Sequence, residues 1–189
     1  MGTKQDKHVD SREQLIVAAQ ALYAEAGVAA TTPRQVMQRS GIGQGSLYHH
    51  FPSKRDLARA AVERTAREQL HAAEGVLVGD PSPRERIRAY LLRDRDALAG
   101  CRIGRLTSDQ AVMSDESLVE PVEGYFSGLI DLLGSALEES GLSHGQAGDR
   151  AAAIVAVVQG GYVLARATGD PERMRSAVRG MVSLLERDH

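Results

Sequence analysis

The stretch that decides the fold runs from Gly41 to Phe51 and reads Gly-Ile-Gly-Gln-Gly-Ser-Leu-Tyr-His-His-Phe. Three apolar residues, Ile42, Leu47 and Phe51, recur at a spacing that anchors a short helix by one face. The outward residues are then Gln44, Gly45, Ser46, Tyr48, His49 and His50. A short docked helix with small, amide, phenol and imidazole groups on its free face is suited to reading base edges in a major groove.

The preceding segment predicts a partner helix. Thr32 and Gln35 form a capping-box pair with Pro33 at the first helical position, so we expect a helix from about Pro33. Ser40 ends that helix, and Gly41 suits a left-handed position after it. Two short helices joined by a Gly-containing turn make a helix-turn-helix, whose second helix is the reader.

From about Ser11 to Val62 the chain resembles the N-terminal domain of TetR-type transcriptional repressors. The matching positions are Ala30-Thr31-Thr32, Ser40-Gly41-Ile42, Gly45-Ser46-Leu47-Tyr48-His49-His50-Phe51-Pro52-Ser53-Lys54 and Asp56-Leu57. So many matches in one register make the resemblance specific. The chain departs from the family pattern at Gln44, where Lys, Arg or Ser is common, and at Pro33, where Val or Thr is common. The resemblance therefore implies DNA binding but no particular operator sequence.

We predict DNA contacts at the outward residues of this region and at the start of the following helix. Lys54 stands beside a helix N-terminus, where unpaired N–H groups favour a phosphate. Gln44, Ser46 and His49 are expected to face bases, because an amide side chain suits adenine and small groups allow close approach. The full set is Thr32, Arg34, Gln44, Gly45, Ser46, Tyr48, His49, His50 and Lys54.

The charge of the chain, −2 overall, is unevenly distributed. Residues 1–70 hold ten Lys and Arg against seven Asp and Glu, whereas residues 71–189 hold thirteen against eighteen. Within residues 31–59 there are five basic residues against Asp56 alone. Phosphate affinity depends on such a local surplus rather than on the total charge.

Composition indicates an ordinary globular protein, with 42% apolar and 25% charged residues. A single cysteine, Cys101, excludes an intramolecular disulfide and suits a reducing cytoplasm. No apolar run approaches the ~18 residues of a membrane span, and Met1 to Asp10 lacks the apolar region of a signal peptide. We therefore expect a cytoplasmic protein without a membrane partner.

The expected fold is all-α, with about nine helices in all. We expect residues 1–10 to form a flexible tail, residues 11–58 a three-helix DNA-binding domain, and residues 59–189 a helical ligand-binding and dimerisation domain. The first helix is capped at Asp10 or Ser11 and stops at Gly27. The later helices are expected from Ser53 to about Glu74, Ser82 to about Ala99, near Met113, Asp115 to Ser140, Gln146 to Ala167, and Asp170 to about Arg187.

The C-terminal part also resembles TetR-family effector domains, more loosely, through Gly-Cys-x-apolar-Gly-x-Leu at residues 100–106. The default ligand site in a helical protein is an apolar cavity between helices with a few polar groups. We expect a pocket lined by Leu91, Ile103, Met113, Leu118, Val122, Tyr125, Phe126, Gln159 and Tyr162. That set carries no charged cluster, so it favours an apolar or weakly polar effector.

Apolar stripes on the last two long helices predict a homodimer built as a four-helix bundle. The interface is expected at Val155, Val158, Tyr162, Met174, Val178, Met181 and Leu185. Packing within one chain is the alternative explanation of the same stripes.

An enzyme is the main alternative function: an all-α enzyme or small-molecule-binding module that carries a helix-turn-helix. The sequence shows no acid/base, nucleophile or metal constellation, so we expect no catalysis, no cofactor and no metal. His49 and His50 are adjacent and project apart, which does not suit a helical zinc site. The Gly41 to Gly45 run lacks the last glycine and the preceding strand of a dinucleotide loop.

Overall fold

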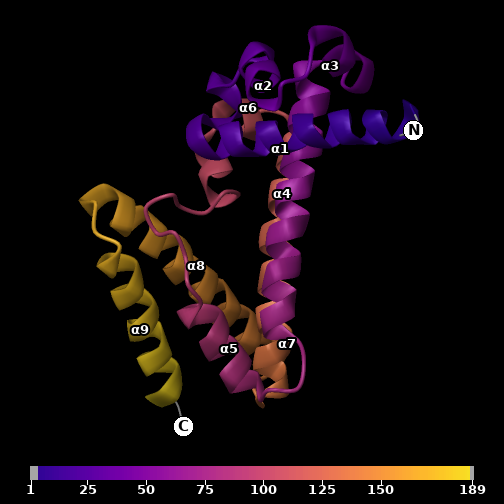
Figure 1. Cartoon of the computed structure of the whole chain (residues 1–189). Coiled ribbons are helices and arrows are strands. Elements are labelled where there is room, and N and C mark those ends of the chain that lie inside the picture. Colours follow the sequence, from indigo (N-terminus) through magenta and orange to yellow (C-terminus); the bar gives the residue numbers. More distant parts are fainter. Residues whose placement is uncertain (1–3, 188–189) are drawn as a thin grey trace. The chain divides into compact units, whose positions relative to one another are not determined.

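The computed structural model describes residues 4–187, with side chains from residue 11 onward, and this part of the chain is helical without strands (Figure 1). The chain divides into two compact units. Unit 1 comprises Met1–Ala66 and Arg105–Val122, and unit 2 comprises Arg67–Gly104 and Glu123–His189.

Unit 1 holds the helix-turn-helix and a distant segment of the chain that packs with it. Its elements are α1 (Lys4–Ala30), α2 (Pro33–Ser40), α3 (Gln44–His50), the first part of α4 (Lys54–Leu77), most of the 3-10 helix η1 (Gly104–Ser108), α6 (Gln110–Met113) and the start of α7 (Glu116–Glu139). Both α2 and α3 contact α1, as does α6. The core contains Leu15, Ala19, Val36, Leu47 and Leu57, each at most 2% exposed.

The first helix is longer than expected. It begins at Lys4 and not at Asp10 or Ser11, because no glycine or proline between Lys4 and Ser11 interrupts the helix. At Gly27 the backbone leaves the helical region, with φ of 85°, so the predicted break is confirmed. The remaining expectation about the tail concerns residues 1–3 and the side chains of residues 4–10, which lie outside the described part.

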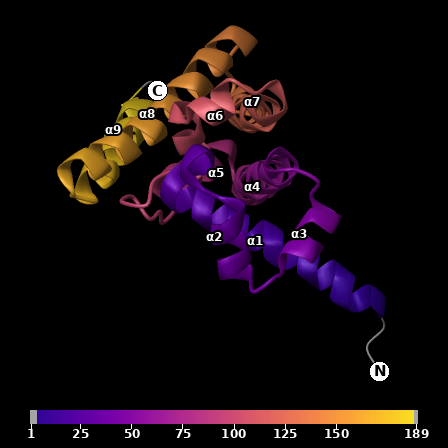
Figure 2. The same cartoon turned by 90° about the horizontal axis from the view of Figure 1, so that it is seen from above.

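Unit 2 contains the second part of α4, α5 (Pro83–Leu92), most of α7, α8 (His144–Thr168) and α9 (Glu172–Arg187). Figures 1 and 2 both show α9 running along α8, and α5 also contacts α9. Ser82 and Glu85 form the capping box that starts α5, as predicted.

The end of α5 differs from the prediction of a helix to about Ala99. It stops at Leu92, because the Arg95 side chain turns back and donates to the Tyr90 and Leu91 carbonyls at the helix end. These hydrogen bonds replace the backbone donors that a longer helix would have supplied.

Helix α8 revises the expectation about apolar segments. By length and composition alone it is apolar enough to cross a membrane. Ala147, Ala151, Ile154 and Val158 are at most 2% exposed within the chain, which is typical of a core helix in a helical bundle.

The predicted dimer residues divide into two groups. Val155, Val158, Met174 and Val178 are already buried within one chain, so they serve the intramolecular core. The other three, Tyr162, Met181 and Leu185, are partly exposed.

Large apolar side chains are nonetheless exposed on the same two helices. Val163 and Leu164 of α8 are 66% and 51% exposed, and Leu184 of α9 is 59% exposed.

Candidate nucleic-acid interface and effector region

Helix α2 is fixed at both ends by the residues that the sequence indicated. The Thr32 side chain accepts from the Gln35 N–H at 3.3 Å, and the Gln35 side chain accepts from the Thr32 N–H at 2.7 Å. Gly41 takes the left-handed conformation with φ of 72° and donates to the Met37 carbonyl. Because both ends are capped, the turn delivers α3 at a defined angle.

Helix α3 is short and depends on its anchors. Leu47 and Phe51 are 2% and 4% exposed, and Ile42 is half-buried. Arg12 of α1 lies over the Phe51 ring, 5.4 Å from its centroid. The predicted docking of α3 through one apolar face is therefore confirmed.

The free face of α3 carries most of the predicted contact residues. Gln44, Gly45, Tyr48 and His49 are exposed, with Tyr48 at 45%. Ser46 is half-buried. His50 differs from the expected outward orientation, because it is half-buried and its Nε2 atom is inaccessible to solvent.

Thr32 and Arg34 of the α2 region are also exposed. Lys54, at the start of α4, is half-buried and its Nζ donates to the Ala29 carbonyl at 3.3 Å. The Lys54 side chain therefore links the start of α4 to the end of α1, just before α2.

The local basic surplus is smaller than the count over residues 31–59 suggests, because three of its arginines meet acids from elsewhere in the sequence. Arg39 pairs with Glu25, Arg55 with Asp115, and Arg59 with Glu63, each at 2.7 Å. Arg34 and Lys54 form no ion pair with the described residues. Within residues 31–59, the positive charge without an ion pair to a described residue therefore lies at these two side chains.

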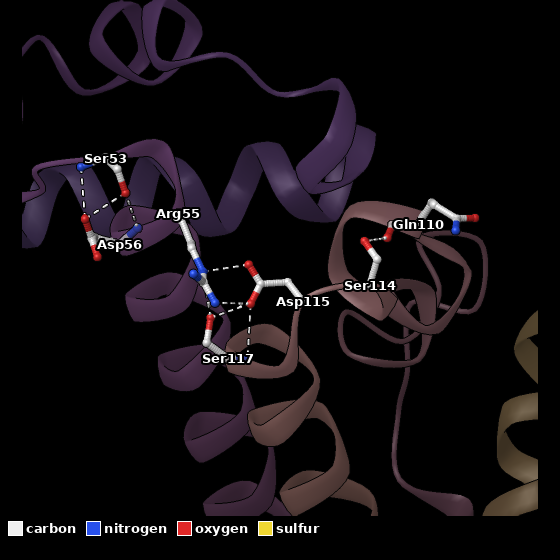
Figure 3. Close-up of polar contacts among 7 residues, drawn as sticks. All are labelled: Ser53, Arg55, Asp56, Gln110, Ser114, Asp115 and Ser117. Carbon is white, nitrogen blue, oxygen red and sulfur yellow. Dashed lines mark hydrogen bonds and ion pairs between the residues drawn. The ribbon is translucent and has the colours of Figure 1, made fainter.

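Figure 3 shows how the start of α4 is tied to the start of α7. Ser53 and Asp56 cap α4 through hydrogen bonds of 2.7 to 3.2 Å. Arg55 reaches Asp115 and the Ser117 hydroxyl, and Asp115 also accepts from the Ser117 hydroxyl and N–H. The hydrogen bond from Ser117, with the contribution of Arg55, lowers the pKa of Asp115.

A second connection within unit 1 was not predicted. One Asp109 oxygen accepts from the Val28 and Ala29 N–H groups at 2.6 and 3.1 Å, and the other caps α6 at Ala111. Arg105 donates to the Ala24 carbonyl and, at 3.2 Å, to the Glu25 carbonyl.

These contacts hold the break in α1 just before the helix-turn-helix. A Cβ atom at Gly27 would lie 2.7 Å from the Asp109 carboxylate, so the close approach requires glycine. The partners are about 80 residues apart in sequence, and no local pattern signals them.

The predicted effector residues are divided between the two units. In unit 1, Leu118 and Val122 are 3% exposed, but Met113 is 46% exposed. In unit 2, Leu91, Ile103 and Tyr125 are at most 3% exposed, whereas Phe126, Gln159 and Tyr162 are half-buried.

Unit 2 brings several of its polar groups together around Cys101. The Cys101 thiol is buried and its sulfur accepts from the Gly104 N–H at 3.2 Å. A methyl group at Gly104 would collide with the Gln159 side-chain oxygen, which therefore lies against this turn. Tyr90, Tyr125 and Tyr162 interact electrostatically with Cys101, so the predicted Tyr125, Gln159 and Tyr162 do share one region.

Burial is the main cause that raises the pKa of all three tyrosines, Tyr90, Tyr125 and Tyr162. Their phenols are consequently neutral hydrogen-bonding groups in an apolar surrounding. No cluster of three or more His, Cys, Asp or Glu residues with metal-binding geometry occurs among the described residues.

Comparisons with known proteins agree with this architecture. Residues 15–61 match the family described as bacterial regulatory proteins, tetR family. Residues 86–179 match the family described as transcriptional regulator LmrA/YxaF-like, C-terminal domain.

The Bacillus subtilis HTH-type transcriptional regulator YxaF is 28% identical over 168 residues, which cover 85% of this chain and 87% of that protein. The HTH-type transcriptional repressor KstR2 of Mycolicibacterium smegmatis is 33% identical over 91 residues, or 46% of this chain and 42% of that protein. The crystal structure of a TetR-family transcriptional regulator from Agrobacterium tumefaciens matches with a TM-score of 0.82 and 27% identity, covering 93% of this chain and 97% of that one.

Proposed function

The chain belongs to the TetR family of bacterial transcriptional regulators, and from this premise we propose that it is a repressor released from its operator by a small-molecule effector. It is a DNA-binding regulator, as the family is. The observation that carries the proposal is the exposed face of α3 held on two buried anchors, Leu47 and Phe51. The relatives named above are transcriptional regulators, which does not support the alternative of an all-α enzyme with an added helix-turn-helix.

The proposed DNA contacts separate into two classes. Thr32, Tyr48 and Lys54 contact phosphates, while Gln44, Ser46 and His49 face base edges and Gly45 allows the close approach. The exposure of Gln44, Tyr48 and His49 supports this division. Arg34 adds an exposed positive charge that has no acidic partner among the described residues.

The proposed effector site lies in unit 2, near Tyr125, Gln159 and Tyr162. Neutral phenols and an amide in an apolar surrounding support an apolar or weakly polar effector over a phosphate. Leu91, Ile103 and Phe126 belong to the same unit and supply the apolar part of the proposed lining.

Release is proposed to act through α4, which contributes residues to both units. In a dimer, the two α3 helices would bind two half-sites whose separation is set by the DNA helical repeat of ~34–36 Å. A shift of a few ångströms between these two helices would prevent them from binding both half-sites at once. By reciprocity the operator weakens effector binding by the same factor.

TetR-family regulators are cytoplasmic DNA-binding proteins that form dimers and bind effector ligands, and they are not enzymes. For this chain we propose a homodimer through α8 and α9, no membrane partner and no catalytic activity. Support for the dimer comes from the exposed Val163, Leu164 and Leu184, whose burial against a second copy would remove apolar surface from water.

The test is a mobility-shift titration on the DNA upstream of the protein's own gene, repeated at several salt concentrations. A repressor of this kind gives a specific complex whose log affinity falls linearly with log salt concentration, because bound phosphates release counterions. Equal affinity for the upstream fragment and for a scrambled fragment of the same length would refute sequence-specific regulation.

A further inference from the structure

A cleft between the end of α5 and the start of α9 is lined by an excess of arginines. It has a volume of about 230 Å³ and lies within unit 2. Its charged lining residues are Arg93, Asp94, Arg95, Arg175 and Arg179, and its apolar wall includes Leu92, Met174 and Val178. Four arginines and one aspartate therefore line this cleft.

The two arginines on the α5 side have no acidic partner among the described residues. Both guanidinium groups lie over the Tyr90 ring, at 4.7 Å for Arg93 and 5.2 Å for Arg95. The ring attracts each cation but carries no net charge to neutralise them. Asp94 accepts a hydrogen bond from the Arg95 backbone N–H, within the local turn.

Arg95 is the more buried of the pair. Its guanidinium donates to the Tyr90, Leu91 and Arg93 carbonyls, but its Nε is buried without a hydrogen-bond partner. Burial, and after it the neighbouring Arg93 charge, lower the pKa of Arg95. A buried donor without a partner next to a like charge is a costly arrangement.

The arginines on the α9 side of the cleft, in contrast, have an acidic partner. Arg175 and Arg179 both bond to Glu172, at 3.2 and 2.6 Å. The positive charge without an acidic partner therefore lies at Arg93 and Arg95, next to the apolar wall. An inorganic anion would contact the arginines alone, whereas an organic acid would contact the arginines through its acid group and the wall through its apolar part.

We propose that this cleft binds a small organic carboxylate, with its acid group at Arg93 and Arg95 and its apolar body against Leu92, Met174 and Val178. At ~30 Å³ per water molecule, the cleft has room for roughly seven or eight waters, which suits an acid of the size of one ring. The residues that line this cleft differ from Tyr125, Gln159 and Tyr162 of the proposed effector region, although Arg93 and Arg95 interact electrostatically with Tyr162.

Benzoate is the probe that tests the proposal on the full-length protein. We expect a titration followed by NMR to shift the amide signals of residues 92–97 and the methyl signal of Met174 in a saturable way. Benzyl alcohol has nearly the same shape without charge and should shift them weakly. Inorganic phosphate supplies charge without the apolar body, so binding equal to that of benzoate would overturn the choice of an organic acid.

Arg93→Gln is the informative variant, because the Arg93 guanidinium has no hydrogen bond to a described residue and the Arg95 bonds that close α5 remain. Losing a charge-assisted hydrogen bond should weaken benzoate about tenfold or more. Arg93→Lys should retain part of the affinity, and Arg84→Gln, at the other end of α5, should bind as the wild type does. Unchanged benzoate affinity in Arg93→Gln, or signals that shift only outside the cleft, would overturn the site.

Discussion

Two side chains of the helix-turn-helix separate phosphate binding from base reading. Lys54→Ala removes one ammonium group, so we expect weaker binding to all DNA sequences alike and a salt slope that is smaller by about one. Gln44→Ala removes an exposed amide on α3 and should cost ~1–3 kcal/mol at particular base pairs only.

Binding titrations on a set of single-base operator variants make this comparison. Arg102→Ala, an exposed arginine in unit 2, is the control for loss of a positive charge anywhere on the chain. If both test variants lost affinity uniformly over the whole set, the separation of roles would be wrong.

The buried tyrosines predict how stability depends on alkaline pH. Burial raises the pKa of Tyr90, Tyr125 and Tyr162 above the unfolded value of about 10. The unfolded chain therefore releases these protons first as the pH rises, so the stability that the neutral phenols contribute is intact below pH ~10 and declines above it.

Tyr125→Phe removes one of the ionising groups and should make the alkaline decline of the unfolding free energy less steep. Denaturant unfolding at a series of pH values from 8 to 11 measures that slope. Tyr48→Phe removes an exposed hydroxyl as a matched control. A wild-type slope in Tyr125→Phe would show that this phenol does not cause the decline.

At the scale of elements, the contact of α6 with the end of α1 depends on one carboxylate. Asp109→Ala leaves the Val28 and Ala29 N–H groups without their acceptor, and we expect a loss of about 1–3 kcal/mol in unfolding free energy. Hydrogen exchange should accelerate at Val28 and Ala29 in particular.

Asp149→Ala is the matched control, since Asp149 is exposed and makes no hydrogen bond or ion pair with the described residues. Unchanged exchange at Val28 in Asp109→Ala would mean that solvent replaces the carboxylate at no cost.

Sequence reasoning succeeded for elements whose determinants are local. The caps at Thr32, Ser53, Ser82 and Asp115 each join groups at most three residues apart, and the left-handed Gly41 follows from its own lack of a side chain. The candidate reader face was predictable for the same reason, because the anchors of α3 lie within the helix-turn-helix itself.

The misjudged features depend on residues that fold back or come from far along the chain. The end of α5 is set by the Arg95 side chain returning to its carbonyls, which periodicity does not register. Arg55 gains its acid from Asp115, 60 residues away, so counting charges within residues 31–59 overestimated the free positive charge. The dimer prediction was affected in the same way, because contacts with α9 and the rest of unit 2 decide which face of α8 is buried within one chain.

For the whole molecule, the exposed apolar side chains of α8 and α9 carry the prediction of a dimer. Val163 is 66% exposed, so Val163→Glu should leave the single chain folded while placing a charge in the interface. We expect sedimentation at micromolar concentration to show a dimer for the wild type and a monomer for this variant.

Val78→Glu is the control, because Val78 is 56% exposed and lies outside α8 and α9. Val178→Glu would not test the interface, because it would place a charge in the core of one chain, where Val178 is only 5% exposed. A monomeric wild type, or a Val163→Glu protein that remains dimeric, would remove this interface from consideration.

The ties from Asp109 and Asp115 to α1 and α4 bear on how a DNA-reading module of this kind is transplanted. A fragment cut near residue 58 would keep the helix-turn-helix but lose the carboxylates that hold Val28 and Arg55. A chimaera that joins this helix-turn-helix to the effector domain of another protein would lack the contacts that support the break at Gly27, unless residues 105–122 are transferred as well. The exchangeable cassette is therefore discontinuous in sequence, and recombination that respects it requires two crossovers more than a simple head-to-tail fusion.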